Sequence, residues 1–235
     1  MADAVEVSAR IQRNLARVEE RIQRACNDAG RPRSSVQLLP ITKYVDAVTT
    51  GWLHQCLPVP LGESRPQVIW EKAAVLPQVE WHLVGHLQRN KVARTLPLVS
   101  MIHSVDSQRL LQAIDEEARK LNKVQVVLLE LHLTHEETKS GFGRDEWDKL
   151  PEYVAPLKHV QVQGLMGMAA MEGSLDEARR TFEELRSLRD SWQSRFSAPH
   201  SLHHLSMGMT QDLEQAIAAG STIVRVGSAL FEGIS

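Results

Sequence analysis

The chain has little of several features that would assign it to a specialised class of protein. It has two cysteines, Cys26 and Cys56, with no CxxC or Cys/His spacing of a metal site around them. No apolar run approaches the roughly 20 residues of a membrane span, and the first residues lack the apolar core of a signal peptide. We therefore expect a reduced, cytoplasmic protein that requires neither a disulfide nor a membrane anchor.

An excess of charge of either sign is also absent. Lys and Arg number 27 against 29 Asp and Glu, which gives a formal net charge of -2. Without a basic field, nonspecific attraction to nucleic acid or to anionic lipid is weak, so we expect neither as a partner. What the chain does have is length, because 235 residues suffice to bury roughly 70% of the unfolded surface.

Strand and helix patterns alternate through almost the whole chain. Residues 4–29 have apolar side chains three or four positions apart and predict an amphipathic helix, which Gly30-Arg31-Pro32 ends. Eight candidate strands follow, at 36–43, 58–62, 81–85, 101–104, 124–131, 160–165, 203–205 and 222–226. Helices are predicted between them, over 65–76, 88–96, 107–121, 145–154, 176–192 and 210–219. Strands separated by helices imply parallel pairing through crossovers.

This order predicts an α/β protein with a single domain over residues 1–235. The expected architecture is an eight-stranded (β/α)8 TIM barrel at 36–232, preceded by the extra N-terminal helix at 4–29. A doubly wound open sheet is the alternative, but it requires a Gly-rich turn after the first strand. The residues there are Lys43-Tyr44-Val45-Asp46, and no linker rich in Pro, Gly or Ser divides the chain. We therefore favour the barrel.

The last thirty residues carry the clearest functional pattern. Two short strands run into turns of small residues, Ser206-Met207-Gly208 and Gly227-Ser228, and then into helices. Small residues let backbone N–H groups approach an anion, and a helix N-terminus adds a favourable dipole. In α/β barrels the loops after strands seven and eight commonly hold phosphate. We therefore expect a phosphorylated ligand here, with simple helix capping by these turns as the alternative.

Lys43 ends the first predicted strand, at the edge of the barrel where active sites lie. A lysine that closes a buried strand should be partly desolvated, which lowers the pKa of its amine and favours Schiff-base chemistry. A side chain that extends to solvent is the alternative. Other polar or sulfur-containing residues expected at this edge are Glu63, Ser64, His82, His86, His103, Asp106, Met166, Ser206 and Arg225. His82 and His86 are four residues apart but lack a matching third ligand, so we expect no metal site.

Over nearly its whole length the chain resembles the YggS/PROSC family of pyridoxal 5'-phosphate homeostasis proteins. The segments that carry the resemblance are, in order, LLPITK, LGESRPQ, EWHLVGHLQRNKV, IHSVDS, ETKSGF, GLMGMA and LSMGMTQDLEQAIAAGSTIVRVGSALFEG. The resemblance implies a fold-type III barrel like the amino-terminal part of alanine racemase. It also implies pyridoxal 5'-phosphate (PLP) bound as a covalent aldimine to Lys43, and a role in holding and delivering this cofactor inside the cell.

The same resemblance assigns roles to individual residues. It implies phosphate contacts at Ser206, Gly227 and Ser228, with Arg225 facing the pyridine nitrogen. The further residues that it implies near the cofactor ring are Met166 and His82. Ser64 stands where the family usually has Asn, and the turn after Lys43 lacks the proline that is common there. An arginine only donates hydrogen bonds, so it leaves the ring nitrogen unprotonated and weakens the cofactor as an electron sink.

Whether the protein is an enzyme depends on a second proton-transfer group. Racemisation requires one on each face of the substrate, and in the related racemases a tyrosine from a separate β domain of the partner subunit supplies it. The chain has only Tyr44, expected to point away from Lys43 along a strand, and Tyr153, in a predicted helix. We therefore expect a PLP carrier rather than an enzyme, a monomer or weak homodimer, with PLP-dependent apo-enzymes as candidate recipients. The alternatives are a weak alanine racemase-like enzyme and a cofactor-free Schiff-base aldolase.

Overall fold

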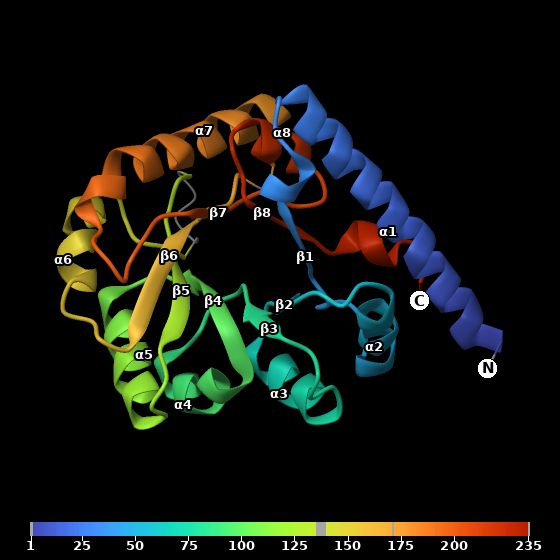
Figure 1. Ribbon diagram of the computed structural model, residues 1–235, viewed down its shortest axis with the longest axis horizontal. Coiled ribbons are helices and arrows are strands. Elements are labelled where there is room, and N and C mark those ends of the chain that lie inside the picture. The colour runs from blue at the N-terminus through green and yellow to red at the C-terminus, as the bar shows by residue number, and fades with distance from the viewer. Residues whose placement is uncertain (1, 135–139, 171, 235) are drawn as a thin grey trace.

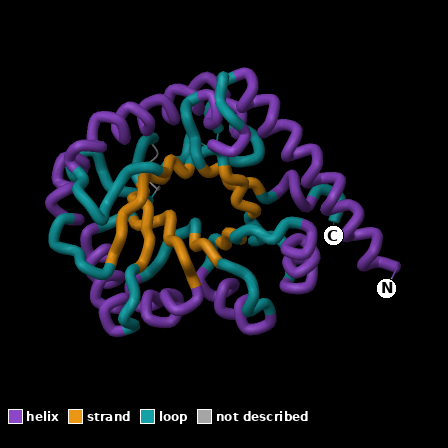
Figure 2. The backbone as a smooth tube through the Cα atoms, viewed as in Figure 1, coloured by secondary structure: helices purple, strands orange, loops and turns teal. Residues whose placement is uncertain are grey.

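Eight parallel strands form one sheet in the order β1-β8-β7-β6-β5-β4-β3-β2. The computed structural model describes residues 2–134, 140–170 and 172–234. The strands are β1 (Gln37–Pro40), β2 (Leu61–Glu63), β3 (Trp81–Leu83), β4 (Val99–Val105), β5 (Gln125–Glu130), β6 (Val160–Met166), β7 (His204–Ser206) and β8 (Ile223–Val226). A bridge between Ile41 and Gly62 joins the two edge strands and closes the ring seen in Figure 2. The predicted barrel and its eight strands are confirmed, although β1 ends three residues before Lys43.

Helices surround the strands on the outside (Figure 1). They are α1 (Ala2–Asp28), α2 (Ala47–Cys56), α3 (Pro66–Val75), α4 (Val92–Thr95), α5 (Gln108–Lys120), α6 (Leu150–Val154), α7 (Leu175–Trp192) and α8 (Leu213–Ala218). The sequence did not predict α2, whose Thr49-Thr50-Gly51 core is a weak helix former. The Asp46 side chain starts it by accepting a hydrogen bond of 2.8 Å from the Thr49 backbone N–H. None of the helices in the described ranges is long and apolar enough to cross a membrane.

The N-terminal helix α1 packs against both α8 and the short 3-10 helix Ser228–Phe231 near the end of the chain. Asn14, which is buried, donates hydrogen bonds to the backbone oxygens of Leu230 and Glu232 at 3.1 and 3.0 Å. In Figure 1 the long blue helix lies along this red C-terminal segment. The additional helix thus holds the segment that follows β8, which carries one of the predicted phosphate turns.

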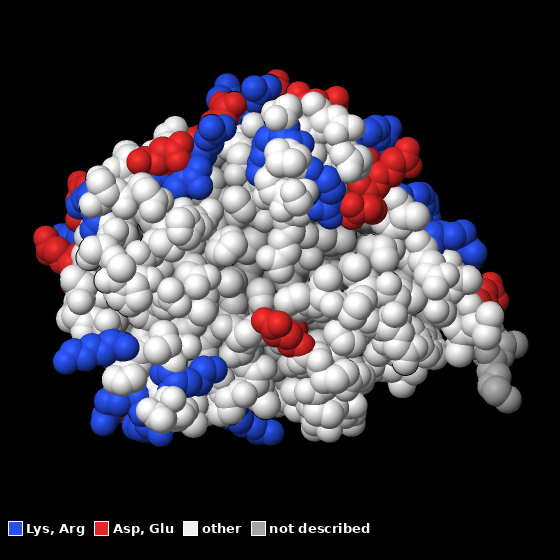
Figure 3. Space-filling view, in the orientation of Figure 1, with Lys and Arg blue, Asp and Glu red and all other residues white. Residues whose placement is uncertain are grey.

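Charged side chains gather on the helices rather than over the middle of the barrel. On the face seen in Figure 3, Lys and Arg lie over α4 and α5, and mixed charges follow α1 and α7. The region between them is uncharged apart from an acidic group near the centre of the view. Apart from that group, the charged side chains on this face therefore form separate groups at its edges, and they do not form one continuous patch of a single sign.

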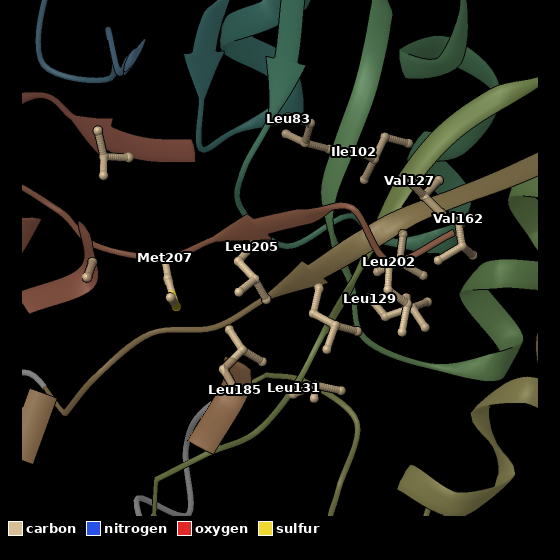
Figure 4. Close-up of a cluster of buried hydrophobic side chains, with 14 of the residues drawn as sticks. Leu83, Ile102, Val127, Leu129, Leu131, Val162, Leu185, Leu202, Leu205 and Met207 are labelled. Atoms are coloured by element: carbon tan, nitrogen blue, oxygen red, sulfur yellow. The ribbon is translucent and has the colours of Figure 1, made fainter. Parts of the chain in front are cut away.

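Buried apolar residues form two clusters, one on each side of the sheet. The larger cluster fills the layer between strands and helices, and Figure 4 shows part of it around Leu129, Val162 and Leu205. The smaller cluster contains Leu39, Ile41 and Ile223, whose side chains share the inner face of the barrel. Side chains alternate between the two faces of a strand. The remaining inner positions are largely polar, and these polar residues build the site described next.

Candidate functional site

Arg225 lies inside the barrel on β8, two residues after the inward-facing Ile223, and is only 5% exposed. Its Nη1 donates to the backbone oxygen and to Oγ of Ser206, both at 2.7 Å, and its Nη2 donates to the Gly167 oxygen at 3.2 Å. Burial lowers the pKa of Arg225 to about 10, and the carboxylates of Glu130 and Asp212 oppose this shift. The guanidinium therefore stays charged at neutral pH, as a fixed cation near the carboxyl ends of the strands.

Two buried histidines extend this polar interior across the barrel. His82 Nδ1 on β3 lies 3.0 Å from His103 Nε2 on β4, and His103 Nδ1 lies 2.9 Å from Ser206 Oγ. Desolvation lowers the pKa of His82 to about 4 and the pKa of His103 well below its ordinary value. Both imidazoles are therefore neutral near pH 7. The structure thus brings His82, Ser206 and Arg225 together, but only through His103, which the sequence placed at a strand end without assigning it a role.

The structure contradicts two expectations about Lys43 and its neighbour. Lys43 is exposed rather than desolvated, because β1 ends at Pro40 and the chain, after the buried Ile41 and Thr42, turns towards solvent at Lys43. Its Nζ lies 4.7 Å from the centroid of the Tyr44 ring. Tyr44 therefore does not point away from Lys43, because the two residues belong to a turn and not to a strand. The amine is accessible from outside the barrel and has an aromatic contact.

A second amine near this turn was missed by sequence reasoning. Lys72, on α3, is 4% exposed, and its Nζ donates to Glu63 Oε1 at 2.6 Å and to the Thr42 backbone oxygen at 2.8 Å. Glu63 Oε1 also accepts a hydrogen bond of 2.6 Å from Thr42 Oγ1. The sequence did contain a signal that Lys72 is buried, because it lies three residues after Ile69, on the same inner face of the helix. The sequence alone did not say which acid would accompany it.

The two predicted phosphate turns meet at the mouth of the barrel. Thr210, after β7, and Ser228, after β8, place their hydroxyl oxygens 3.1 Å apart. Gly227 lies against the residue that directly follows β1, since a Cβ there would be 3.1 Å from the Ile41 backbone oxygen. Ser206 is deeper: it is fully buried, and its hydroxyl contacts His103 and Arg225. Thr210 was not predicted, although it is the hydroxyl residue of the same SMGMT turn.

Met166 and Ser64 occupy the remaining predicted positions. Met166 ends β6 and pairs with Glu130 on one side and Ser206 on the other, and it is buried. Burial raises the pKa of Glu130, whose Oε1 accepts a hydrogen bond from Ser140 at 2.8 Å. Ser64 directly follows β2 and is half-buried. The ETKSGF segment lies only in part within the described residues, because 135–139 fall outside them.

Known proteins are similar to this chain in sequence and in fold. The model of the alanine racemase N-terminal domain matches residues 68–234. A pyridoxal phosphate homeostasis protein of Aquifex aeolicus is 40% identical over 219 residues, which cover 92% of this chain and 95% of that protein. A crystal structure of a protein from Bifidobacterium adolescentis has a TM-score of 0.89 and 34% identity, covering 96% of each chain.

A second solved structure is PipY of Synechococcus elongatus PCC7942 with PLP bound. It has a TM-score of 0.81 and is 31% identical, covering 94% of this chain and 99% of that one. The similarity thus extends over nearly the full length of this chain and of these relatives. The chain belongs to the family of pyridoxal phosphate homeostasis proteins, built on the alanine racemase N-terminal domain.

Proposed function

We propose that this chain binds pyridoxal 5'-phosphate through Lys43 and serves in the intracellular homeostasis and delivery of that cofactor. The observation that carries the proposal is the arrangement at the carboxyl ends of the strands. An accessible lysine follows β1, and the loops after β7 and β8 meet through Thr210 and Ser228. The PLP-bound PipY structure, 31% identical over nearly the full chain, supports it.

The phosphate fits between the loops that follow β7 and β8. The hydroxyls of Thr210 and Ser228 can both donate to an anion, and Gly227 keeps the backbone free of a side chain at that point. We assign the direct hydroxyl contacts to Thr210 and Ser228. Ser206, proposed from the family motif, has its hydroxyl committed to two buried partners, so we assign it to the support of Arg225.

The ring of the cofactor fits the inner face beside Met166 and Arg225. When bound, PLP supplies an aldehyde carbon that an amine can bond reversibly. At neutral pH the charged Arg225 guanidinium donates hydrogen bonds but does not give up a proton, so a ring nitrogen that it faces stays unprotonated. It therefore disfavours carbanion chemistry, which suits storage and release rather than turnover. His82 does not contact the proposed ring position directly in this arrangement; as a neutral buried ring it supports His103, which it contacts through Nδ1.

We propose that the chain has no robust racemase activity of its own. Racemisation requires proton-transfer groups on both faces of the substrate. Tyr44 lies beside the Lys43 ammonium rather than opposite it. Tyr153, on α6, packs against Phe142 in the outer layer, with ring centroids 6.4 Å apart. Neither tyrosine of the chain thus opposes Lys43 across the barrel mouth.

Borohydride trapping tests the proposal directly. The full chain is incubated with PLP, reduced, digested and mapped by mass spectrometry. We expect the label on Lys43 and its loss in Lys43→Ala, whereas Lys120→Ala, at an exposed lysine of α5, keeps it. A label on the buried Lys72, or no label, would overturn the assignment. Turnover of L- or D-alanine above that of free cofactor would instead favour the weak racemase.

A further inference from the structure

A continuous line of polar side chains runs through the barrel from its amino end to Arg225. It starts at Glu80, directly before β3, whose side chain is 57% exposed and whose Oε1 lies 3.7 Å from His82 Nε2. It continues through His82 and His103 at 3.0 Å and reaches Ser206 Oγ at 2.9 Å. The line thus has an anion at the solvent end and the buried guanidinium at the other.

Only two arrangements of protons satisfy these contacts. Each neutral imidazole has a single N–H, and Arg225 can only donate to Ser206. In the first arrangement, the Ser206 hydroxyl donates to His103 Nδ1, His103 Nε2–H donates to His82 Nδ1, and His82 Nε2–H faces Glu80. In the second, His82 Nδ1–H donates to His103 and His103 Nδ1–H donates to Ser206. The second leaves a bare Nε2 lone pair of His82 facing Glu80.

The Glu80 carboxylate selects the first arrangement. A negative charge 3.7 Å from Nε2 attracts an N–H and repels a lone pair. Every donor then points from Arg225 towards Glu80, and each hydrogen bond polarises the next in the low-dielectric interior. The Ser206 proton is thereby directed to His103, so the oxygen lone pairs face the Arg225 Nη1 at 2.7 Å.

We propose that Glu80 acts through His82 and His103 as a positioning residue for Arg225, and so couples the amino end of the barrel to the cofactor site at its carboxyl end. The coupling to the cofactor rests on the proposed function, whereas the proton arrangement does not. The other charged or titratable groups that face this line are His204 on β7 and the carboxylates Glu130 and Asp212 beside Arg225.

Histidine tautomers in the cofactor-free full chain test the relay. In nitrogen-15 NMR, assigned with single His→Gln variants, we expect both His82 and His103 to carry the proton on Nε2. Glu80→Gln replaces the carboxylate with an amide that can donate to a bare Nε2, so the Nδ1–H form should appear in both rings together. Glu71→Gln, at an exposed acid of α3, should change neither ring. Nδ1–H in the wild type, or unchanged tautomers in Glu80→Gln, overturns the relay.

A titration with PLP tests the coupling separately. Glu80→Gln should raise the dissociation constant severalfold, because the Ser206 proton is no longer directed away from Arg225, and Glu71→Gln should leave it unchanged. Reversed tautomers with unaltered affinity would overturn the coupling. A wild type that does not bind PLP would refute the proposed function, and the tautomer spectra would still decide the relay.

Discussion

The Lys72 ammonium donates a hydrogen bond of 2.8 Å to the backbone oxygen of Thr42, the residue directly before Lys43. The same ammonium forms a buried ion pair with Glu63, at 2.6 Å. Lys72 comes from α3, which packs on the outer side of the sheet, so the contact reaches the end of β1 from behind the barrel wall. The buried Lys72 thus holds Thr42 in place, directly before the exposed Lys43.

Splitting this ion pair should be costly. Lys72→Met leaves the Glu63 carboxylate buried without its cation, so we expect the free energy of unfolding to fall by about 3–5 kcal/mol in urea denaturation. Adding Glu63→Gln removes the orphaned charge and should recover part of the loss. Lys120→Met, at an exposed lysine, serves as the control. A double variant that is less stable than Lys72→Met would contradict the role of the pair.

Thr210 offers a test of the phosphate assignment. Thr210→Val keeps the shape of the side chain but removes the hydroxyl that meets Ser228. Hydrogen bonds to charged groups contribute about 1.5–3 kcal/mol, so we expect the dissociation constant for PLP to rise by roughly tenfold or more. Thr181→Val, on the outer helix α7, is the matched control. Equal affinities of Thr210→Val and the wild type in an absorbance titration would rule out the contact.

The two neutral histidines predict loss of stability in acid. Burial lowers the pKa of His82 to about 4 and that of His103 well below its usual range, whereas an unfolded histidine titrates near about 6.5. Below that value the unfolded chain binds more protons than the folded one, so stability falls with pH. We expect full stability above about pH 6.5 and a progressive loss down to about pH 4. The Glu80 carboxylate raises the pKa of His82 and so opposes the loss of stability. His204 lowers the pKa of both histidines, and Arg225 lowers that of His103, so these two groups reinforce the loss.

Urea denaturation at a series of pH values measures this dependence. His82→Gln removes one of the two groups and should flatten the slope between neutral and acid pH. His203→Gln, at an exposed histidine, should keep the slope of the wild type. The interpretation fails if all three proteins lose stability in parallel.

Asn14 predicts a contribution of α1 to the C-terminal segment. Asn14→Ala leaves the Leu230 and Glu232 oxygens without the donor that now reaches both. An unsatisfied buried group costs about 1–3 kcal/mol, which thermal or urea unfolding would detect. Gln23→Ala removes an exposed side-chain amide of the same helix and should have little effect. Equal stabilities of the two variants would count against the contact.

Much of the fold follows from the sequence because strand and helix signals are local. Short apolar runs bounded by Gly, Pro and polar residues located all eight strands, and the order of strands and helices indicated the barrel. The first strand was predicted to be too long, because Ile41 continues the apolar pattern of the strand although pairing with β8 ends at Pro40. The helix α2 was missed because Thr49-Thr50-Gly51 hides its periodicity.

The interior of the site was less predictable, because it depends on contacts between distant residues. His103 and Ser206 are 103 positions apart, and no local pattern says that one faces the other. Glu63 and Lys72 are closer in sequence, but their pairing behind the sheet requires the packing angle of α3. The motifs did indicate the loops after β7 and β8, since small residues after a strand are a local signal. They did not distinguish the deep Ser206 from the superficial Thr210.

The closure of the barrel has a consequence for how the protein opens. β1 and β2 meet at the Ile41–Gly62 bridge and the hydrogen bond from Thr42 N–H to the Gly62 oxygen, whereas β5 and β6 are paired at six positions. In backbone pairing, the junction of the wall beside Lys43 is therefore thinner than the β5–β6 junction. Amide protons there should exchange with solvent before those of β5 and β6. Under the proposed function, the cofactor is thus held beside a thinly paired part of the barrel wall, where local opening breaks few backbone hydrogen bonds.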